Sequence, residues 1–435
     1  MSSPRVGSPP VRLGLRENLG QFTLLALVNL LVGGMVGLER TVTPLVGAQV
    51  FGLGDLTIAL FVMAFGLTKA VTNLVGGAVV GRYTRKKVLI AGWVVGLPVP
   101  LLLAYAPNWW WVIAANVLLG VNQGLTWSMT VNMKIDLVGP ARRGLALGIN
   151  ETAGYLGVAV TALVTGYLAT AYGLQPAPEL LGAAYAVAGL GLTLTLVRDT
   201  TAHARLEADQ HHARRRDDEQ DRGGRSGATA TPGLGTMFAE LTWRNRNLTS
   251  ISQAGLVNNL NDGLTWVLLP VLLVQAGVSV GGVGVVKALY PFMWAVGMLG
   301  TGHLADRIGR KIPVVAGMAI QAVGLLIIVL GLSRAFLAGI VGSFLLGVGT
   351  ALVYPALLAA ISDGVHPVAR AAALGGYRFW RDLGYAVGAL VGGLTAALAS
   401  LEAAVLVAAA LTAASAVWSQ VAMHGRDRSA GPRRS

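Results

Sequence analysis

Residues 302–311 read GHLADRIGRK, a short and strongly basic turn that lies between two long apolar stretches. Residues 77–86 read GAVVGRYTRK and lie in the same position in the first half of the chain. The earlier turn keeps the leading glycine and the basic residues, but Gly81 stands where the later turn has the acid Asp306. A turn that occurs twice between apolar runs indicates a duplicated architecture.

A second repeat surrounds these turns. Moving residues 118–148 forward by 227 positions aligns them with residues 345–375 at many identical residues. The identities include Leu118-Leu119-Gly120-Val121 with Leu345-Leu346-Gly347-Val348, Asp136 with Asp363, Pro140 with Pro367, Arg143 with Arg370 and Gly148 with Gly375. Apolar composition alone does not produce identities at a fixed offset. The sequence therefore predicts two homologous halves related by a pseudo-two-fold axis along the membrane normal.

The composition explains what these halves are made of. Of the 435 residues, 54% are hydrophobic and only 12% are charged, and the mean hydropathy is +0.63. Soluble domains carry about 25% charged residues, and about 20 apolar residues span a bilayer. Twelve such stretches are expected near 21–46, 55–80, 87–106, 109–133, 144–171, 179–197, 249–274, 281–302, 312–331, 335–360, 371–397 and 401–423.

These spans predict an all-α membrane protein with two six-helix bundles, at 1–197 and 249–435. Residues 198–248, which are polar, of mixed charge and rich in Gly, Ser and Thr, form the predicted linker.

The distribution of Lys and Arg sets the expected orientation. If the N-terminus is cytoplasmic, 27 of the 33 basic residues fall in cytoplasmic segments, and Arg334 alone falls in an external connector. Positive loops face the cytoplasm, so we expect both termini and the linker inside a multi-pass protein of the cell membrane, inner or plasma. The net charge of +13 is then a topology signal and does not indicate a nucleic-acid-binding surface.

The stretch 302–311 matches, without a departure, the loop signature G-x-x-x-D-R-x-G-R-K/R of the major facilitator superfamily, which this chain resembles over its whole length. The resemblance implies twelve helices in two pseudo-symmetric bundles that rock around a central cavity, giving alternating access. It also implies a cytoplasmic gate, although a simple positive-inside stop signal would explain the arginines equally well. The gate residues would be Gly77, Arg82, Arg85, Gly302, Asp306, Arg307, Gly309 and Arg310.

Two features separate the chain from the drug antiporters of that superfamily. Those proteins usually carry an arginine in the fourth helix, where this chain has Asn116, and a Gly-Pro pair in the fifth, whereas residues 148–154 contain no proline. The resemblance to the superfamily therefore does not extend to that subgroup.

Several kinds of chemistry have no residues to perform them. The sequence has no Gly-rich phosphate-binding loop, no zinc-binding histidine pair, no nucleophile elbow and no cysteine, so we expect neither an enzyme nor a cofactor nor a metal site. All six histidines fall in or beside cytoplasmic segments. Any proton carried through the membrane must therefore use carboxylates.

Charged side chains within the spans are costly and indicate a functional pathway. The proton-coupling candidates are Glu39, Glu151, Asp262 and Asp382, their charge partners are Arg40, Lys69, Arg378 and Arg381, and Lys287 is a further base. The 227-residue shift maps Glu151 onto Arg378, and Asp382 follows Arg378 at i, i+4. We therefore expect Arg378 to pair with these two acids in turn. Permanent salt bridges that hold the helices together are the alternative.

Polar and aromatic residues lie at helical spacing on three of the spans and are candidates for the cavity wall. They are Asn116, Gln123 and Trp127, then Asn259 and Trp266 beside Asp262, then Tyr385 beside Arg378 and Arg381. Aromatic walls with a few charges suit a small amphiphilic organic solute.

We interpret the chain as a proton-coupled exporter, an antiporter of small organic, drug-like compounds. One alternative is a carrier of organic anions or metabolites with Arg378, Arg381 and Lys69 as counter-ions, and another is a non-transporting membrane scaffold or receptor. The expected partners are the small-molecule substrate, protons and the lipid bilayer, with no nucleic acid, and we expect a monomer.

Overall fold

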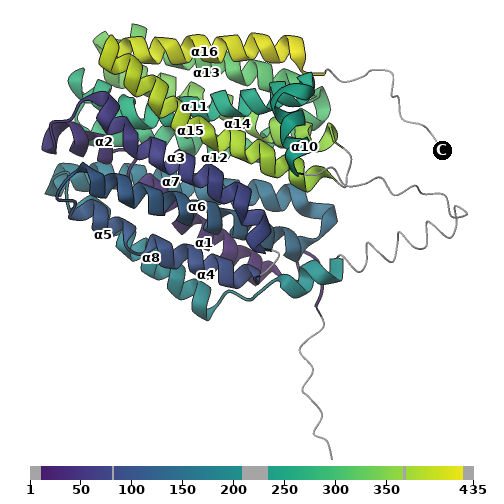
Figure 1. Cartoon of the computed structure of the whole chain (residues 1–435). Coiled ribbons are helices and arrows are strands. Elements are labelled where there is room, and N and C mark those ends of the chain that lie inside the picture. Colours follow the sequence, from purple (N-terminus) through teal and green to yellow (C-terminus); the bar gives the residue numbers. More distant parts are fainter. Residues whose placement is uncertain (1–10, 81–82, 208–233, 366–368, 425–435) are drawn as a thin grey trace, which may run out of the picture.

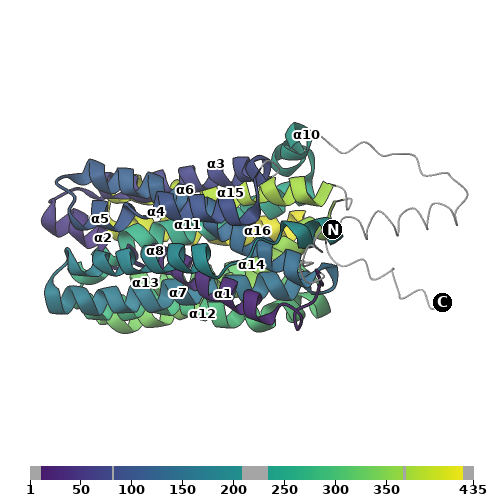
Figure 2. The same ribbon diagram turned by 90° about the horizontal axis from the view of Figure 1, so that it is seen from below.

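The computed structural model describes residues 11–80, 83–207, 234–365 and 369–424. Within these ranges every regular element is a helix, and most helices run along one common axis (Figure 1). The side view in Figure 2 places α10 (Leu234–Ala239), from the end of the linker, and the start of α1 (Leu19–Gly37) toward one end of this bundle. That end, called the linker end below, is the one that the sequence predicts to be cytoplasmic, and the opposite end is called the far end.

The first half contains six crossings of the bundle. They are α1 (Leu19–Gly37), α3 (Asp55–Val80), α4 (Arg85–Gly96) continued by α5 (Val99–Ala104), α6 (Trp109–Val138), α7 (Arg143–Tyr172) and α8 (Ala177–Thr195). Short elements join them: α2 (Thr43–Leu45), the π-helix η1 (Val46–Val50) and the 3-10 helix η2 (Pro140–Arg142).

The second half repeats this plan. Its crossings are α11 (Arg246–Gln275), α12 (Val280–Ile308), α13 (Lys311–Leu330), α14 (Ala335–Asp363), α15 (Arg370–Leu398) and α16 (Leu401–Ala422), with the 3-10 helix η4 (Leu332–Arg334) before α14. In the linker, α10 (Leu234–Ala239) and the π-helix η3 (Glu240–Arg244) precede α11.

Ten of these helices are long and apolar enough to cross a membrane. The two crossings that fall short, α6 and α15, carry polar and charged residues such as Gln123, Lys134, Arg381 and Asp382 inside the bundle. The predicted fold class of two six-helix bundles is thus confirmed, and the least apolar helices are those that supply the polar interior.

Two of the predicted spans are interrupted. The expected helix 21–46 breaks after Gly37, and the irregular residues 38–42 place Glu39 and Arg40 outside regular helix. The expected helix 87–106 breaks between α4 and α5, where Pro98 and Pro100 cannot donate backbone hydrogen bonds. The sequence is apolar on both sides of each break. Hydropathy therefore predicts one continuous helix in each case and does not reveal the break.

Polar side chains set where several helices begin. Asn108 accepts from the backbone N–H of Trp110 at the start of α6, and Ser279 accepts from that of Gly282 at the start of α12. Asn245 and Ser400 cap α11 and α16 in the same way. Such caps satisfy N–H groups that have no partner within the helix.

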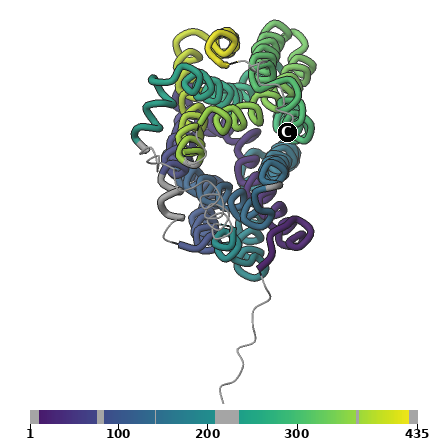
Figure 3. Tube along the Cα trace, turned by 90° about the vertical axis from the view of Figure 1, so that its right-hand side faces the viewer, coloured from purple at the N-terminus to yellow at the C-terminus, as the bar shows by residue number. Residues whose placement is uncertain are grey.

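The halves meet along two seams, α3 against α15 and α7 against α12. Figure 3, viewed along the bundle, shows the first half in purple to teal on one side and the second half in green to yellow on the other. At the end of the predicted linker, Phe238 of α10 stacks on Trp380 of α15 with ring centroids 5.6 Å apart. Part of the predicted linker is therefore ordered helix packed against the second half.

Candidate functional site

The break after α1 brings a charge across the boundary between the halves. Arg40 donates from Nη1 and Nη2 to both carboxylate oxygens of Asp262 in α11, with 2.9 Å between Nη2 and Oδ2. The two residues are 2% and 1% exposed. A bidentate and buried pair of this kind is strong and geometrically specific. The structure thus brings into contact two residues that are 222 positions apart in the sequence.

Aromatic residues complete this group, which we call the far cluster. Tyr385 of α15 donates its hydroxyl to Asp262 Oδ2 at 3.0 Å, and Trp266 Nε1 donates to the free carbonyl of Glu39 at 3.1 Å. The guanidinium of Arg40 lies 4.5 Å from the ring centre of Trp266. Lys287 joins the cluster through a 2.7 Å bond from its ammonium to the carbonyl of Thr265.

Glu39, unlike the adjacent Arg40, forms no ion pair among the described residues. Its side chain is fully buried, and neither carboxylate oxygen has a hydrogen-bond partner among the described residues. The Asn116 carbonyl oxygen is also buried without a partner, and its amide group donates to the Val112 carbonyl at 3.0 Å. Glu39 is thus a proton-binding candidate that no described cation neutralises.

A narrow central cavity lies between the halves and toward the linker end. Residues from both halves line it: Lys69, Asn73, Gln123, Trp127, Ser128, Glu151, Tyr354, Arg378 and Arg381. Six of them were predicted from sequence, namely Lys69, Gln123, Trp127, Glu151, Arg378 and Arg381. The 227-residue repeat contains the signal for a seventh, because it maps Trp127 onto Tyr354.

Asp382 forms an ion pair with the adjacent Arg381. Arg381 donates to Asp382 Oδ1 from Nε at 2.9 Å and from Nη2 at 2.6 Å, and its Nη1 donates to the Tyr354 hydroxyl at 2.5 Å. Asn73 of α3 donates to the other carboxylate oxygen. The expected i, i+4 pair of Arg378 with Asp382 is not formed in this conformation, because the adjacent arginine folds back onto the acid and Asn73 occupies its remaining oxygen.

Two cations in the cavity have no carboxylate within ion-pair distance among the described residues. The ammonium of Lys69 instead lies 5.3–5.5 Å from the ring centres of Phe65, Trp127 and Tyr385. Arg378 lines the same cavity as Glu151 but forms no ion pair with it in the part of the chain that the structure describes. The expected direct charge pair between Glu151 and Arg378 is absent from this conformation.

Glu151 contributes the one carboxylate among the described residues of the cavity wall. Its Oε1 accepts from Trp127 Nε1 at 2.8 Å and from Asn150 Nδ2 at 3.2 Å, while Oε2 has no described partner. Asn150 in turn accepts at 2.7 Å from Lys134, a fully buried residue. Sequence reasoning had assigned Lys134 to a cytoplasmic connector, although its spacing of seven residues from Trp127 places both on one face of α6.

The remaining predicted wall residues lie elsewhere. Asp262, Trp266 and Tyr385 belong to the far cluster. Asn116 lies with Glu39 inside the first half. Asn259 is buried within the second half, where it accepts a 3.4 Å bond from Asn258. Helical spacing identifies the face of each helix but not how far along the bundle each residue lies.

The halves pack closely at the far end. A Cβ atom on Gly166 of α7 would lie 2.8 Å from the Cα of Gly284 in α12, and one on Gly66 of α3 would lie 2.6 Å from the backbone nitrogen of Ala386 in α15. Toward the middle, Tyr155 stacks on Trp294 with ring centroids 3.5 Å apart. This close approach leaves no passage between α7 and α12 at the far end.

The same seam is open toward the linker end. Gly144 and Gly148 continue the face of α7 that carries Thr152 and Tyr155, and Gly302 continues the face of α12 that carries Ala295. A Cβ atom at any of these three glycines would meet no atom within 4 Å. The α7–α12 seam is therefore closely packed at the far end and more loosely packed at these positions toward the linker end.

Two of the predicted gate residues, Arg310 and Arg85, form ion pairs within their own halves. Arg310 donates to Asp306 at 2.5 Å and to Asp363 at the end of α14 at 3.1 Å. In the first half, Arg85 lies 3.4 Å from Asp136, the repeat equivalent of Asp363. Partial burial opposes the charge of Arg310, but hydrogen bonds from its guanidinium to these carboxylates raise its pKa above the usual value.

The glycine of the later turn has a clear conformational role. Gly309 ends α12 with a φ of 89°, in the left-handed region that other residues rarely adopt. Gly302 lies inside α12 and Gly77 in the last turns of α3. Arg82 and Gly81 lie outside the described residues, and Arg307 keeps its position at the end of α12.

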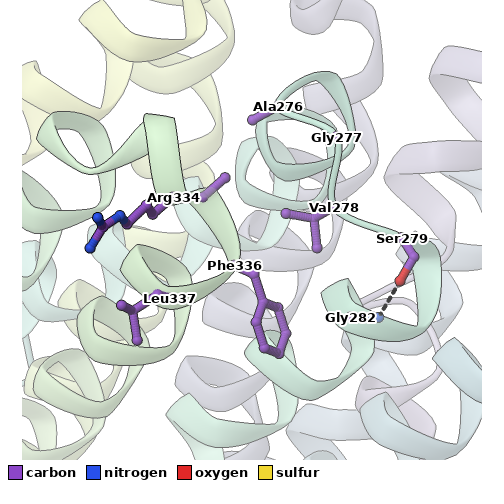
Figure 4. Close-up of a pocket in the computed structure, with 9 residues that line it drawn as sticks. Ala276, Gly277, Val278, Ser279, Gly282, Arg334, Phe336 and Leu337 are labelled. Carbon is purple, nitrogen blue, oxygen red and sulfur yellow. Dashed lines mark hydrogen bonds between the residues drawn. The ribbon is translucent and has the colours of Figure 1, made fainter.

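A second hollow of about 640 Å³ opens on the far surface, between the loop after α11 and the start of α14. Figure 4 shows its lining, with Phe336 and Leu337 on one side, Val278 and Ser279 on the other, and Arg334 at the edge. It contains no acid and no side chain of the central cavity, so it does not extend the polar pathway.

Paired helical bundles with charges gathered between them define a membrane protein of the transporter class. The family model of the Major Facilitator Superfamily matches residues 24–246 and 251–434. The chain therefore belongs to the major facilitator superfamily, which confirms the resemblance seen in the sequence. No curated protein sequence matches it.

Solved structures support the same fold. A mutant of the nucleoside transporter NupG is 13% identical with a TM-score of 0.71, over 93% of this chain and 100% of that one. A structure from work on substrate recognition in proton dependent oligopeptide transporters is 15% identical with a TM-score of 0.70, over 93% and 98% of the two chains. A bacterial homolog of the human lysosomal transporter Spinster, inward-facing and unoccupied, is 15% identical with a TM-score of 0.65, over 96% of each.

Proposed function

We propose that this transporter carries small organic anions by alternating access and that proton uptake at Glu151 accompanies the cycle. The observation that carries the proposal is the charge balance of the central cavity. Lys69 and Arg378 line it without a carboxylate partner among the described residues, while Arg381 and Asp382 compensate each other. Lys69 is buried and Arg378 is partly buried, and cations in such a site that lack a protein counter-ion are suited to bind an anionic ligand group.

The walls indicate the rest of the ligand. Trp127 and Tyr354 line the cavity on opposite halves, and Asn73, Gln123 and Ser128 add hydrogen-bonding groups. The ligand that fits these residues has a carboxylate or similar anionic group joined to a planar or apolar body. The anionic group would contact the cations, and the body would contact the aromatic rings. The NupG and oligopeptide transporters show that this fold carries polar organic solutes, which supports the size class.

We assign the proton of this cycle to Glu151. Its carboxylate is 1% exposed, and Oε2 lacks a described partner, so that oxygen is free to take a proton. Protonation would remove the one described negative charge of the wall and would strengthen the attraction for an anion. Proton uptake and anion binding would then favour each other.

Proton-driven export of amphiphilic, drug-like compounds is the second candidate. The stacked pair Tyr155 and Trp294 beside Trp127 favours it, because such aromatic surfaces bind apolar bodies. In this case the membrane-embedded acids, including Glu39 and Asp262, would exchange protons for the substrate.

Transport by purified protein in liposomes tests both candidates. A panel of radiolabelled organic anions, and of cations of matched size, is offered with and without a pH gradient. We expect uptake of anions, faster when the gradient drives protons in the same direction, and loss of anion uptake in Arg378→Gln and in Lys69→Met. Uptake of cations alone, unchanged in Arg378→Gln, would contradict the anion proposal and support the second candidate.

A further inference from the structure

Lys134 is a cation buried inside the first half with no described carboxylate at ion-pair distance. It lies one turn before the end of α6, and its side chain is fully buried. Its ammonium donates one described hydrogen bond, to Asn150 Oδ1 at 2.7 Å. A buried ammonium without a counter-charge is strongly disfavoured, so a compensating charge must lie close by.

Asn150 links that cation to an acid. The amide oxygen of Asn150 accepts from Lys134, and the amide nitrogen donates to Glu151 Oε1 at 3.2 Å. The amide dipole thus presents its negative end to the ammonium and its positive end to the carboxylate. The reverse orientation would place N–H groups against an ammonium, so the two charges determine how the amide is oriented.

The surrounding helix holds this bridge in place. The backbone carbonyl of Asn150 accepts from Asn29 Nδ2 at 2.7 Å. The side-chain oxygen Oδ1 of Asn29 accepts from the Thr130 hydroxyl at 2.8 Å. Asn29 lies on α1, Thr130 and Lys134 on α6, and Asn150 on α7. Three helices are therefore joined around a network in which every described side chain is buried.

We propose that Lys134 is a positioning residue that acts through Asn150 as a counter-charge of Glu151 within the first half. The inference rests on the proposed role of Glu151 as the proton acceptor. Lys134 thus compensates a negative charge on Glu151 from within the first half, and Oε2 of Glu151 has no described partner. Lys134 thereby sets the pH at which the transporter takes up its proton.

Other titratable groups also face Glu151. They are Lys69 from α3, Tyr354 from α14, and Arg378 with Arg381 and Asp382 from α15. Tyr354, Arg378, Arg381 and Asp382 belong to the second half, so their distances to Glu151 change as the halves rock, whereas Lys69 faces the cavity from the first half. Lys134 is in the same half as Glu151, and its link is independent of that movement.

The first test is a double-mutant cycle on stability in detergent. We expect Lys134→Met and Glu151→Gln each to lower the unfolding temperature, and the double variant to recover most of the loss, because no buried charge then remains unpaired. Lys287→Met combined with Glu151→Gln is the matched control, since Lys287 is equally buried but bonded to Thr265. Additive losses for Lys134 and Glu151, or a double variant that does not fold, would overturn the proposal.

The second test measures the pH profile of transport in liposomes. An opposite charge at short range typically shifts the proton affinity of a carboxylate by about one to three pH units. We therefore expect Lys134→Met to move the midpoint of the profile upward by about one unit, Lys134→Arg to restore it, and Asn150→Leu to reproduce the shift. An unchanged midpoint in folded Lys134→Met would refute the inference.

The two tests separate the proposals. If the stability cycle shows coupling while no organic anion is transported, the Lys134–Glu151 link stands and the proposed substrate class fails. If anions are transported with a normal pH profile in Lys134→Met, the substrate class stands and the role of Lys134 fails.

Discussion

At Gly154, α7 passes so close to Trp127 that a Cβ atom there would lie 2.4 Å from ring carbon Cη2. The same residue also contacts α1, because a Cβ on Gly33 would lie 1.9 Å from the Gly154 carbonyl oxygen. The absence of a side chain thus allows the indole to lie across α7 and reach Glu151. The contact between Trp127 and Glu151 therefore depends on Gly154, which has no side chain.

We predict that Gly154→Ala displaces Trp127, breaks its 2.8 Å bond to Glu151 and slows transport. Overpacking of this kind costs about 1–3 kcal/mol of stability. Transport rates and unfolding temperatures, measured on the same preparation, would show the change. Gly148→Ala on the same helix is the control, since no atom lies within 4 Å of its Cβ, and equal effects at both positions would disprove the steric argument.

The Arg40–Asp262 pair makes a second prediction at the residue scale. Removing one partner leaves the other charge buried and unpaired, which costs about 3–5 kcal/mol, whereas removing both leaves neither of these two charges. Arg40→Met and Asp262→Asn should each lower the unfolding temperature by more than the double variant does.

The control for that cycle is Arg310 with Asp363, whose carboxylate is 60% exposed. Exposed pairs contribute about 0–1 kcal/mol, so little coupling is expected there. Equal coupling in the two cycles would show that burial does not distinguish the pairs.

At the scale of elements, the turn between α12 and α13 attaches to the end of α14. Arg310 makes this connection, and Asp306 holds the arginine from one turn earlier. The equivalent contact of Arg85 with Asp136 joins α4 to α6, and Thr200 donates to the same carboxylate at 2.6 Å. Each tie stiffens the linker end of one half, so that the half can move as a unit.

We predict that Asp306→Asn folds and inserts normally but slows turnover, because Arg310 loses one of its two carboxylate anchors. The carboxylate is 64% exposed, so the loss of stability should stay below about 1 kcal/mol. Expression, unfolding temperature and initial transport rate are the measurements. Wild-type turnover at wild-type expression would reduce Asp306 to a topology signal without a role in the cycle.

At the scale of the whole molecule, alternating access requires the closely packed far end to open. A cross-link that prevents this opening tests it. At the far end, a Cβ on Gly281 would lie 3.3 Å from the Thr170 hydroxyl across the α7–α12 seam. The chain has no cysteine, so an introduced pair has no competing thiol.

We predict that Thr170→Cys with Gly281→Cys forms a disulfide under mild oxidation, stops transport, and recovers activity on reduction. A bond there would hold the far end closed and prevent the cycle. A gel-mobility shift after proteolytic cleavage within the linker reports the cross-link.

Gly148→Cys with Gly302→Cys is the comparison, because those positions face open space in this conformation. It should cross-link only when the linker end closes, so substrate or a pH gradient should change its rate. Transport that continues through a fully cross-linked far end would rule out alternating access along this seam.

The sequence alone predicted the overall architecture of the molecule. Apolar runs long enough to span a bilayer, a repeat at a fixed offset and a basic turn found twice are local patterns, so they can be seen without coordinates. They predicted the two six-helix bundles, the superfamily and the charges inside the helices. Six of the nine cavity residues followed from helical spacing combined with the cost of burying charge in a membrane.

The pairing of those charges was decided by the tertiary structure. Asp382 pairs with Arg381 rather than Arg378, Arg40 reaches Asp262, and Lys134 lies inside the bundle rather than in a connector. Each outcome depends on the rotation, depth and breaks of helices far apart in the chain. A buried charge needs a partner within a few ångströms, and a small rotation or shift of a helix changes which side chain that partner is.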